Sequence, residues 1–201
     1  MLTIGLTGQS GAGKGEFSRV FCTYDGVVCI DTDRTAREVV EKEKPCLYEL
    51  CEYFGNEILD SDGELDRKKL ASIAFCDEDK HNKLNEITHR YIMEEIKSWL
   101  SQVEKDGAKI AIIDAPLLFE SGADRLCDIT VGIIAPYRTR LKRILKRDGI
   151  DKKSAKLRLD AQPDDKFFKE RCTHIIANNG NLNSLIKKAK AFIEPLLENQ
   201  P

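Results

Sequence analysis

The sequence predicts an α/β fold in which a parallel five-stranded sheet is flanked by helices. Short apolar segments alternate along the chain with segments whose apolar residues recur at helical spacing, and this alternation is typical of parallel sheets. A glycine-rich turn joins the first apolar segment to the first helical one, where α/β proteins that bind phosphate place such a turn. One long stretch without strand patterns interrupts the alternation and is predicted to be an all-helical insertion.

Five apolar segments are the predicted strands. The fourth is almost wholly apolar, as expected for a strand that is covered on both faces. In the insertion, Asp66 is the expected N-cap of one helix, and a longer helix is expected at about 79–103. The strands are predicted at residues 2–7, 26–30, 109–113, 129–135 and 174–177, and further helices around 17–21 and at 34–41, 138–146 and 182–197.

The turn after the first strand has the pattern G-x-x-x-x-G-K, which runs from Gly8 to Lys14. Glycines allow the backbone to fold tightly and to approach a ligand without side chains in the way. Backbone N–H groups at the positive end of the following helix then bind phosphate oxygens, and Lys14 adds a mobile positive charge. An ordinary tight turn explains neither the lysine nor the spacing, so the pattern predicts a phosphate-binding loop.

The residue after the lysine is unusual for such a loop. Ser or Thr is common there because its hydroxyl binds Mg²⁺, whereas this chain has Gly15 followed by Glu16. The nearest hydroxyl downstream belongs to Ser18, one turn into the helix. We therefore expect either that Mg²⁺ is held mostly by water and acidic side chains, or that the site is weakened.

Three aspartates follow predicted strands, at the edge where open α/β sheets bind ligands. Asp31 and Asp33 come after the second strand, and Asp114 ends the third. One of the first two is expected to cap the next helix, which leaves the other to accept a proton from an attacking hydroxyl. Asp114 either helps to arrange Mg²⁺ through water or is a turn residue, and the sequence leaves both interpretations open.

A basic helical segment follows the fourth strand. Arg140, Arg143 and Arg147 fall within roughly a 60° arc of a helix, beside its apolar face. Guanidinium groups in that place suit phosphates and the charge of a phosphoryl-transfer transition state, although a solvated charged face is the alternative.

Composition indicates one soluble, globular domain. The chain has 201 residues, of which 41% are hydrophobic and 33% charged, and its net charge of −2 argues against bulk binding to nucleic acid or anionic membrane. No apolar run approaches the roughly 18 residues that span a bilayer, and no signal sequence is evident. The seven cysteines are scattered, so we expect reduced thiols and a cytoplasmic protein, either monomeric or weakly homo-oligomeric.

From residue 2 to about 197 the chain resembles the bacterial dephospho-coenzyme A kinases. The resemblance does not rest on the loop alone but on separated blocks that occur in the family's order. These blocks are residues 4–8, 11–14, 30–33, 62–67, 114–120, 147–149 and 178–180, with His89, Arg158 and Gln162. This family uses ATP and Mg²⁺ to phosphorylate the 3′-hydroxyl of dephospho-coenzyme A, the last step of coenzyme A synthesis.

The resemblance implies a P-loop NTPase-like fold and a role for particular residues. It implies one kinase domain, 1–201, with a helical acceptor-binding insertion at about 45–105 and a helical lid at about 138–165. Lys14, Asp33 and Arg140 would be catalytic. ATP would be bound by Gly8, Gly11, Ala12, Gly13, Lys14, Gly15, Glu16, Arg143, Asn178 and Gly180, the acceptor by Asp33, Arg67, His89 and Leu117, and Mg²⁺ by Asp31 and Asp114 through water.

The chain departs from the family pattern at three positions. Gln9 stands where the family often has glycine, Gly15 replaces Ser or Thr, and Arg90 stands where proline commonly follows the histidine. Two alternative functions stay open on the sequence. One is a related kinase with another nucleotide acceptor, such as a nucleoside monophosphate kinase, and the other is a nucleotide-binding module without catalysis.

Overall fold

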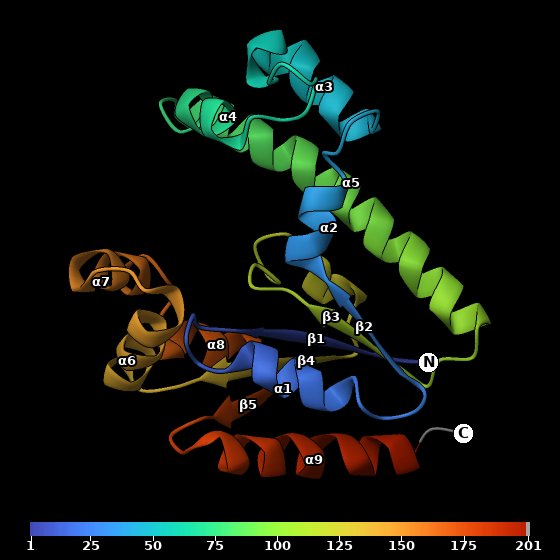
Figure 1. Cartoon of the computed structure of the whole chain (residues 1–201). Coiled ribbons are helices and arrows are strands. Elements are labelled where there is room, and N and C mark those ends of the chain that lie inside the picture. The colour runs from blue at the N-terminus through green and yellow to red at the C-terminus, as the bar shows by residue number, and fades with distance from the viewer. Residues whose placement is uncertain (200–201) are drawn as a thin grey trace. The chain divides into compact units, whose positions relative to one another are not determined.

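The computed structural model describes residues 1–199, which form two compact units. The first, here called the core unit, comprises Met1–Ile30 and the chain from Leu100 onward. The second, here called the helical unit, is Asp31–Trp99. Figure 1 labels the helices and strands of both. None of the helices within residues 1–199 is long and apolar enough to cross a membrane.

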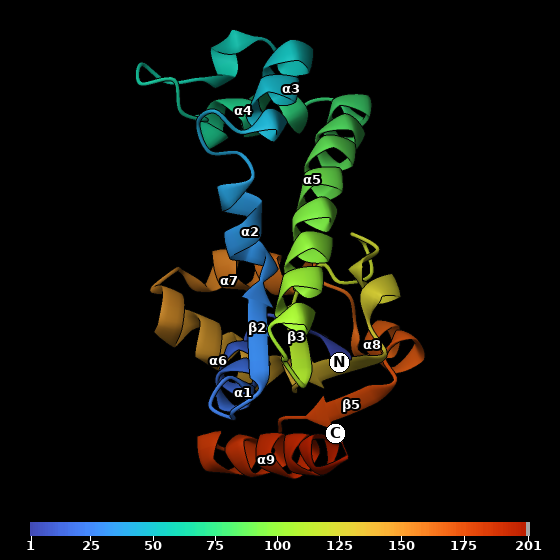
Figure 2. The ribbon, with the colours of Figure 1, turned by 90° about the vertical axis from the view of Figure 1, so that its right-hand side faces the viewer.

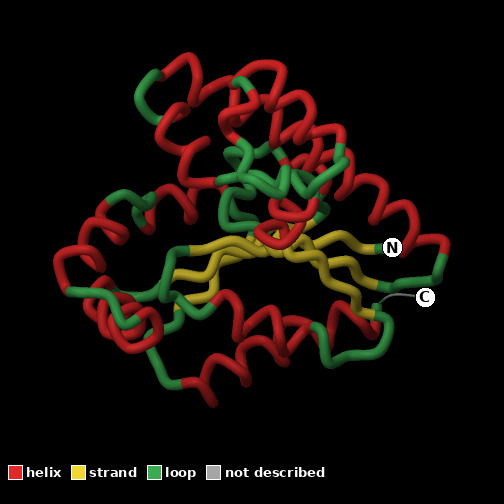
Figure 3. Tube along the Cα trace, turned by 45° about the horizontal axis from the view of Figure 1, so that its top comes forward, coloured by secondary structure: helices red, strands yellow, loops and turns green. Residues whose placement is uncertain are grey.

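The predicted five-stranded sheet is confirmed, and Figure 3 shows its strands as one continuous layer. The strand order is β2-β3-β1-β4-β5, and β1 lies in parallel between β3 and β4. The order places the carboxyl end of β1 beside that of β3, where Leu6 is in register with Asp114. The strands are β1 (Leu2–Gly8), β2 (Val27–Asp31), β3 (Ile110–Asp114), β4 (Ile129–Ile134) and β5 (His174–Ala177).

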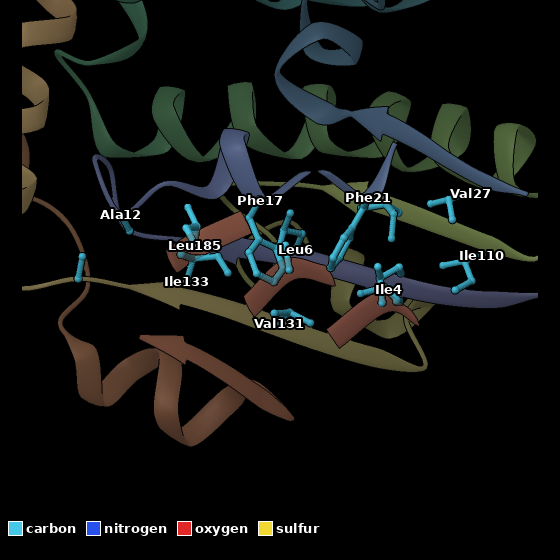
Figure 4. Close-up of a cluster of buried hydrophobic side chains, with 14 residues drawn as sticks. Ile4, Leu6, Ala12, Phe17, Phe21, Val27, Ile110, Val131, Ile133 and Leu185 are labelled. Carbon is cyan, nitrogen blue, oxygen red and sulfur yellow. The ribbon is translucent and has the colours of Figure 1, made fainter. Parts of the chain in front are cut away.

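Helices α1 (Lys14–Phe21) and α9 (Leu182–Glu198) cover one face of the sheet (Figures 1 and 4). Alternate residues of β1, Ile4 and Leu6, point into this layer and are completely buried with Phe17 and Phe21 of α1. Each such side chain contributes about 1.5–3 kcal/mol when it leaves water. The helix that begins at the glycine-rich loop is therefore anchored to the sheet by its apolar side.

The other face is covered at close range because two strands carry glycine. A Cβ on Gly5 of β1 would lie 2.7 Å from the Cys127 sulfur, and one on Gly132 of β4 would lie 2.8 Å from the Cys172 sulfur. Phe168, from α8 (Asp165–Arg171), also packs over Gly132. The short helix η2 (Ala123–Leu126) precedes Cys127.

Three helices follow one another between β4 and β5. The predicted helix at 138–146 is confirmed as α6 (Tyr137–Asp148), and its Ile144 packs with α7 (Lys152–Asp160) in a small separate apolar cluster. The sequence analysis did not resolve α7 or α8 as separate helices. Both are short, with seven to nine residues, and each begins at an aspartate cap, Asp151 or Asp164. Such short charged segments have too few turns for their periodicity to be evident.

The helical unit contains α2 (Thr32–Glu38), α3 (Pro45–Phe54), η1 (Asn56–Ile58), α4 (Arg67–Ala74) and the first turns of α5 (Glu78–Lys105). Figure 2 shows α3 and α4 beside the start of α5. The Tyr91 hydroxyl of α5 donates to Glu49 of α3 at 2.9 Å. Asp66 caps α4 as predicted, because its carboxylate accepts from the backbone N–H groups of Lys68 and Lys69.

The expectation that all seven cysteines are reduced is wrong for one pair. Cys22 and Cys29 form a disulfide between the end of α1 and β2. The turn between them, closed by a bond from the Val27 N–H to the Tyr24 carbonyl, brings their Cα atoms to 6.3 Å. This closeness depends on where α1 ends, which cysteine spacing does not reveal. The other five are free thiols, and burial raises the pKa of Cys127 to about 12.

We predict that reducing the disulfide destabilises the core unit. The bridge joins residues seven apart. Closing a loop of this length lowers the entropy of the unfolded chain, which raises the free energy of unfolding by about 2.5 kcal/mol at 25 °C. Denaturant unfolding of the wild type with and without dithiothreitol should show this difference. The double variant Cys22→Ser, Cys29→Ser should unfold identically in both buffers. Equal stability of the wild type in the two buffers would contradict the prediction.

Candidate active site

The predicted strand–loop–helix arrangement of the phosphate-binding loop is confirmed. β1 ends at Gly8, and α1 begins at Lys14. Gly11 and Gly13 have φ angles of 76° and 106°, which side chains other than glycine rarely adopt. A Cβ on Gly8 would lie 2.4 Å from the Ile133 carbonyl oxygen. The loop therefore needs glycine at these positions for its backbone conformation and for close contact with β4.

The loop is held from outside by two side chains that contact its carbonyl groups. The Asn178 amide, at the end of β5, donates to the Ala12 carbonyl at 2.7 Å. The Arg143 guanidinium donates to the carbonyls of Gly11 (3.1 Å), Ala12 (3.2 Å) and Gly180 (3.1 Å). Arg143, Asn178 and Gly180 were expected beside ATP. In the structure Asn178 and Arg143 bind the loop carbonyls, and the Gly180 carbonyl accepts from Arg143, which braces the loop against the segment after β5.

Lys14 and Asp114 form an ion pair at the opening of the loop. The pair follows from the strand order, because β1 and β3 are neighbours and end side by side. Both side chains are largely buried, with exposed fractions of 18% and 12%. The cation that the loop would offer to a phosphate is thus already balanced by a carboxylate.

Arg140 is buried near the start of α6, with 6% of its surface exposed. Its Nε donates to the Ala135 carbonyl at 3.0 Å, while Nη1 is buried without a hydrogen-bond partner among residues 1–199. Burial lowers the pKa of Arg140, and the nearby carboxylate of Asp165 opposes that shift. Because a guanidinium keeps its charge at neutral pH, Arg140 presents a buried positive charge with one donor group unused.

The prediction that one of the two aspartates at the end of β2 caps the next helix is confirmed. Asp31 is the N-cap of α2, because its carboxylate accepts from the N–H groups of Asp33 (2.9 Å) and Arg34 (3.4 Å). Asp33 is in the first turn of α2, and it is exposed. The capping role therefore belongs to Asp31.

The predicted acceptor residues lie in both units. Arg67 and His89 belong to the helical unit, where Arg67 lines a pocket of about 410 Å³ together with Arg37 and Lys42. His89 is half-buried in α5. Leu117 belongs to the core unit and is 56% exposed, whereas its neighbour Leu118 is completely buried. Only one of these two leucines is part of the core.

The side chains of residues 1–199 include no group of three or more His, Cys, Asp or Glu arranged to hold a metal ion. Gly15 is exposed in the first turn of α1. Apart from its own helix, no atom of residues 1–199 lies within 4 Å of the position that a Cβ on Gly15 would take. The place usually occupied by a hydroxyl side chain thus has room for water.

Three polar side chains that join the loop to the segment between α7 and α8 were given no role from the sequence. They are Gln9, Gln162 and Asp165. The buried side chain of Gln9 donates to the Pro163 carbonyl and to Asp165, and the Ser10 N–H donates to the Gln162 side chain. The bonds join segments more than 150 residues apart in the chain. The one signal in the sequence was the departure from glycine at Gln9.

Comparison with known proteins gives consistent results for sequence and structure. The family model described as dephospho-CoA kinase matches residues 2–184. A dephospho-CoA kinase of Corynebacterium glutamicum is 39% identical over 193 residues, which cover 96% of this chain and 98% of that one. A crystal structure from Thermus thermophilus has a TM-score of 0.81 at 28% identity, covering 97% of each chain. A dephospho-CoA kinase from Campylobacter jejuni has a TM-score of 0.73 at 26% identity, covering 98% of this chain and 97% of that one.

We predict opposite effects on stability for alanine at two glycines of the loop. Gly13→Ala should lower the free energy of unfolding by about 1–3 kcal/mol, because of its positive φ and a Cβ 2.7 Å from the Asn178 amide. Gly15→Ala should raise it by about 0.5–1 kcal/mol, since its site is open and helical. Denaturant unfolding of both variants measures this. Destabilisation by Gly15→Ala as large as that by Gly13→Ala would contradict the assignment.

Proposed function

This chain belongs to the dephospho-coenzyme A kinase family, and on that premise we propose that it transfers the γ-phosphoryl group of ATP to the 3′-hydroxyl of dephospho-coenzyme A. It is a kinase, and this reaction is the last step of coenzyme A synthesis. One observation supports the proposal that the core unit binds ATP and transfers its phosphoryl group. It is the braced loop with the Lys14–Asp114 pair at its opening. We propose a cytoplasmic location because of the relationship to bacterial dephospho-CoA kinases.

The loop from Gly8 to Glu16 is proposed to bind the phosphates of ATP. The first N–H groups of a helix have no partner within the helix, so those at the start of α1 are available to phosphate oxygens. A phosphate that reaches the loop competes with Asp114 for Lys14. The lysine ammonium then stabilises the charge of the transferring group, and Arg140 contributes a second positive charge from the lid.

Asp33 is proposed to be the general base. It accepts the proton of the 3′-hydroxyl while that oxygen bonds to the γ-phosphorus and the bond to the β-phosphate oxygen breaks, which releases ADP. Because Asp31 caps α2, the Asp33 carboxylate is not needed for that structural role. The first turn of α2 would thus supply both a cap and a base.

The pocket lined by Arg37, Lys42 and Arg67 is proposed to bind the pyrophosphate of dephospho-coenzyme A. Its three cationic side chains outnumber the carboxylates of Glu41 and Glu64 in the same lining, and guanidinium groups bind phosphate oxygens in pairs. His89 and the exposed Leu117 are proposed to contact other parts of the acceptor. The segment at about 138–165 is proposed to act as a lid that excludes water, because transfer to water would waste ATP.

Mg²⁺ fits the donor set of this chain when it is held largely through water. Mg²⁺ prefers oxygen ligands and retains several waters, and it neutralises phosphate charge when bound. Asp114 offers a carboxylate next to the loop, and the open surroundings of Gly15 have room for water. Asp31 is proposed as a further acidic contributor, although its carboxylate already accepts two backbone N–H groups.

We predict that Asp33→Asn leaves ATP binding nearly unchanged and lowers turnover by roughly 10²-fold or more, because it removes only the proton acceptor. Calorimetry measures ATP binding, and coupled ADP release measures turnover. Glu38→Gln, on the same helix, is the control and should stay within about twofold of wild type. Turnover that barely changes in Asp33→Asn would exclude it as the base.

The acceptor is tested by ADP formation with ATP, Mg²⁺ and either dephospho-coenzyme A or AMP. Turnover with dephospho-coenzyme A alone is expected. Turnover with AMP alone would instead identify a nucleoside monophosphate kinase. ATP binding without release of ADP in either mixture would identify a non-catalytic nucleotide-binding module. Family membership favours neither of these alternatives.

We predict that Gly15→Ser lowers the Mg²⁺ concentration needed for half-maximal ATP binding by about tenfold, since a hydroxyl replaces a metal-bound water at no cost in space. Gly15→Ala is the matched control and should leave that concentration unchanged. Calorimetric ATP titrations at a series of Mg²⁺ concentrations provide the readout. An equal response of the serine and alanine variants would contradict water-mediated binding at this position.

A further inference from the structure

Gln9 connects three parts of the core unit. Its backbone N–H donates to the Ile133 carbonyl of β4 at 3.2 Å, and its carbonyl accepts from the Ala12 N–H at 2.9 Å. Its side chain is 97% buried and extends toward the segment between α7 and α8. The residue is thus fixed by its backbone to the sheet and the loop, while its side chain reaches the end of the proposed lid.

The side-chain contacts of Gln9 use its amide NH2 group. Nε2 donates to the Asp165 carboxylate at 3.0 Å and to the Pro163 carbonyl at 3.3 Å. Both partners are acceptors, so the NH2 group must face them, and Oε1 is left without a partner among residues 1–199. A third bond, from the Ser10 N–H to Gln162 at 2.9 Å, joins the same two segments.

Asp165 shares a cavity with both Gln9 and Arg140. Gln9 and Asp165 line a cavity of about 770 Å³ together with Arg140 and Tyr137. The carboxylate of Asp165 attracts the buried Arg140 guanidinium, whose carbon atom is 5.7 Å from the centre of the Tyr137 ring. Arg140 keeps one donor, Nη1, buried and without a partner among residues 1–199. This unused N–H group can donate to an anionic oxygen.

We propose that Gln9 is a positioning residue for phosphoryl transfer: its amide holds the Asp165 carboxylate at the cavity that Arg140 also lines, so that the negative charge favours one orientation of the guanidinium that acts on the transferring group. The inference rests on the proposed function, which assigns Arg140 to the phosphates of ATP. Gln9 does this at a position where related loops often have glycine, so the contact is a property of this chain. The positioning role of Gln9 depends on its side-chain NH2 group, because the side-chain oxygen of Gln9 has no partner among residues 1–199.

Inverting the hydrogen bond tests the contact. Gln9→Glu places a carboxylate against that of Asp165, so we expect kcat to fall about 100-fold. Adding Asp165→Asn supplies an amide that donates to the new carboxylate and keeps one negative charge beside Arg140. The double variant should therefore recover kcat to within about threefold of wild type. Gln9→Glu with Asp164→Asn is the matched control and should not recover, since Asp164 accepts from the Phe167 N–H instead.

A double-mutant cycle with Arg140 separates positioning from general stability. Gln9→Ala should lower kcat about tenfold and change the Kd for ATP less than twofold, as expected for one hydrogen bond to a charged group. In an Arg140→Lys background, the same substitution should cost almost nothing further. A residue that only stabilised the fold would lower activity by the same factor in both backgrounds.

The kcat of all variants is measured with the acceptor that supports ADP release by the wild type. If that acceptor is not dephospho-coenzyme A, the proposed function is wrong, but the positioning role of Gln9 can still be tested. The positioning role is wrong if the inverted pair is no more active than Gln9→Glu alone. It is equally wrong if Gln9→Ala costs the same factor with and without Arg140.

Discussion

A backbone loop that turns its N–H groups toward a phosphate leaves carbonyl groups that need donors elsewhere. In this chain Asn178 and Arg143 supply them, from the segment after β5 and from α6. The loop conformation thus depends on contacts with parts of the core unit that are distant in sequence. Its glycines allow the conformation, and these two side chains select it. Arg143 and Asn178, which the sequence analysis expects to bind ATP, thus stabilise the conformation of the loop that is proposed to bind it.

Carboxylates compensate part of the buried positive charge in the core unit. Lys14 is paired with Asp114, and the buried Arg140 lies near Asp165. A buried cation without a partner costs several kcal/mol, so each carboxylate stabilises the apo state. On the proposed function, a phosphate at the loop would replace Asp114 as the partner of Lys14. The family relationship gives this exchange its chemical meaning, because a kinase must hold polyphosphate tightly and still release ADP.

Local patterns were sufficient to predict most elements of the fold. β-Branched runs marked all five strands, and an aspartate before an amphipathic segment marked the start of α4. Prediction was poorer where the decisive contact is not local. The seven-residue spacing of Cys22 and Cys29 looked unremarkable, because only the end of α1 and the following turn bring their Cα atoms to 6.3 Å. Helix α8 was missed because it is a single short segment stabilised by a cap and by packing against β4.

For the site, the sequence by itself determined which groups are available: the G-x-x-x-x-G-K loop, the aspartates that follow strands and the basic helix after β4. These are carried by short motifs whose chemistry depends on residue type and on position relative to one element. Only the tertiary structure decided what each group is paired with. It gave Asp31 to the helix cap, Arg143 to the loop carbonyls and Gln9 to the lid segment. The Asp31 cap is local, whereas the contacts of Arg143 and Gln9 join residues 132 and 156 apart, which are brought together by strand order and packing rather than by any local pattern.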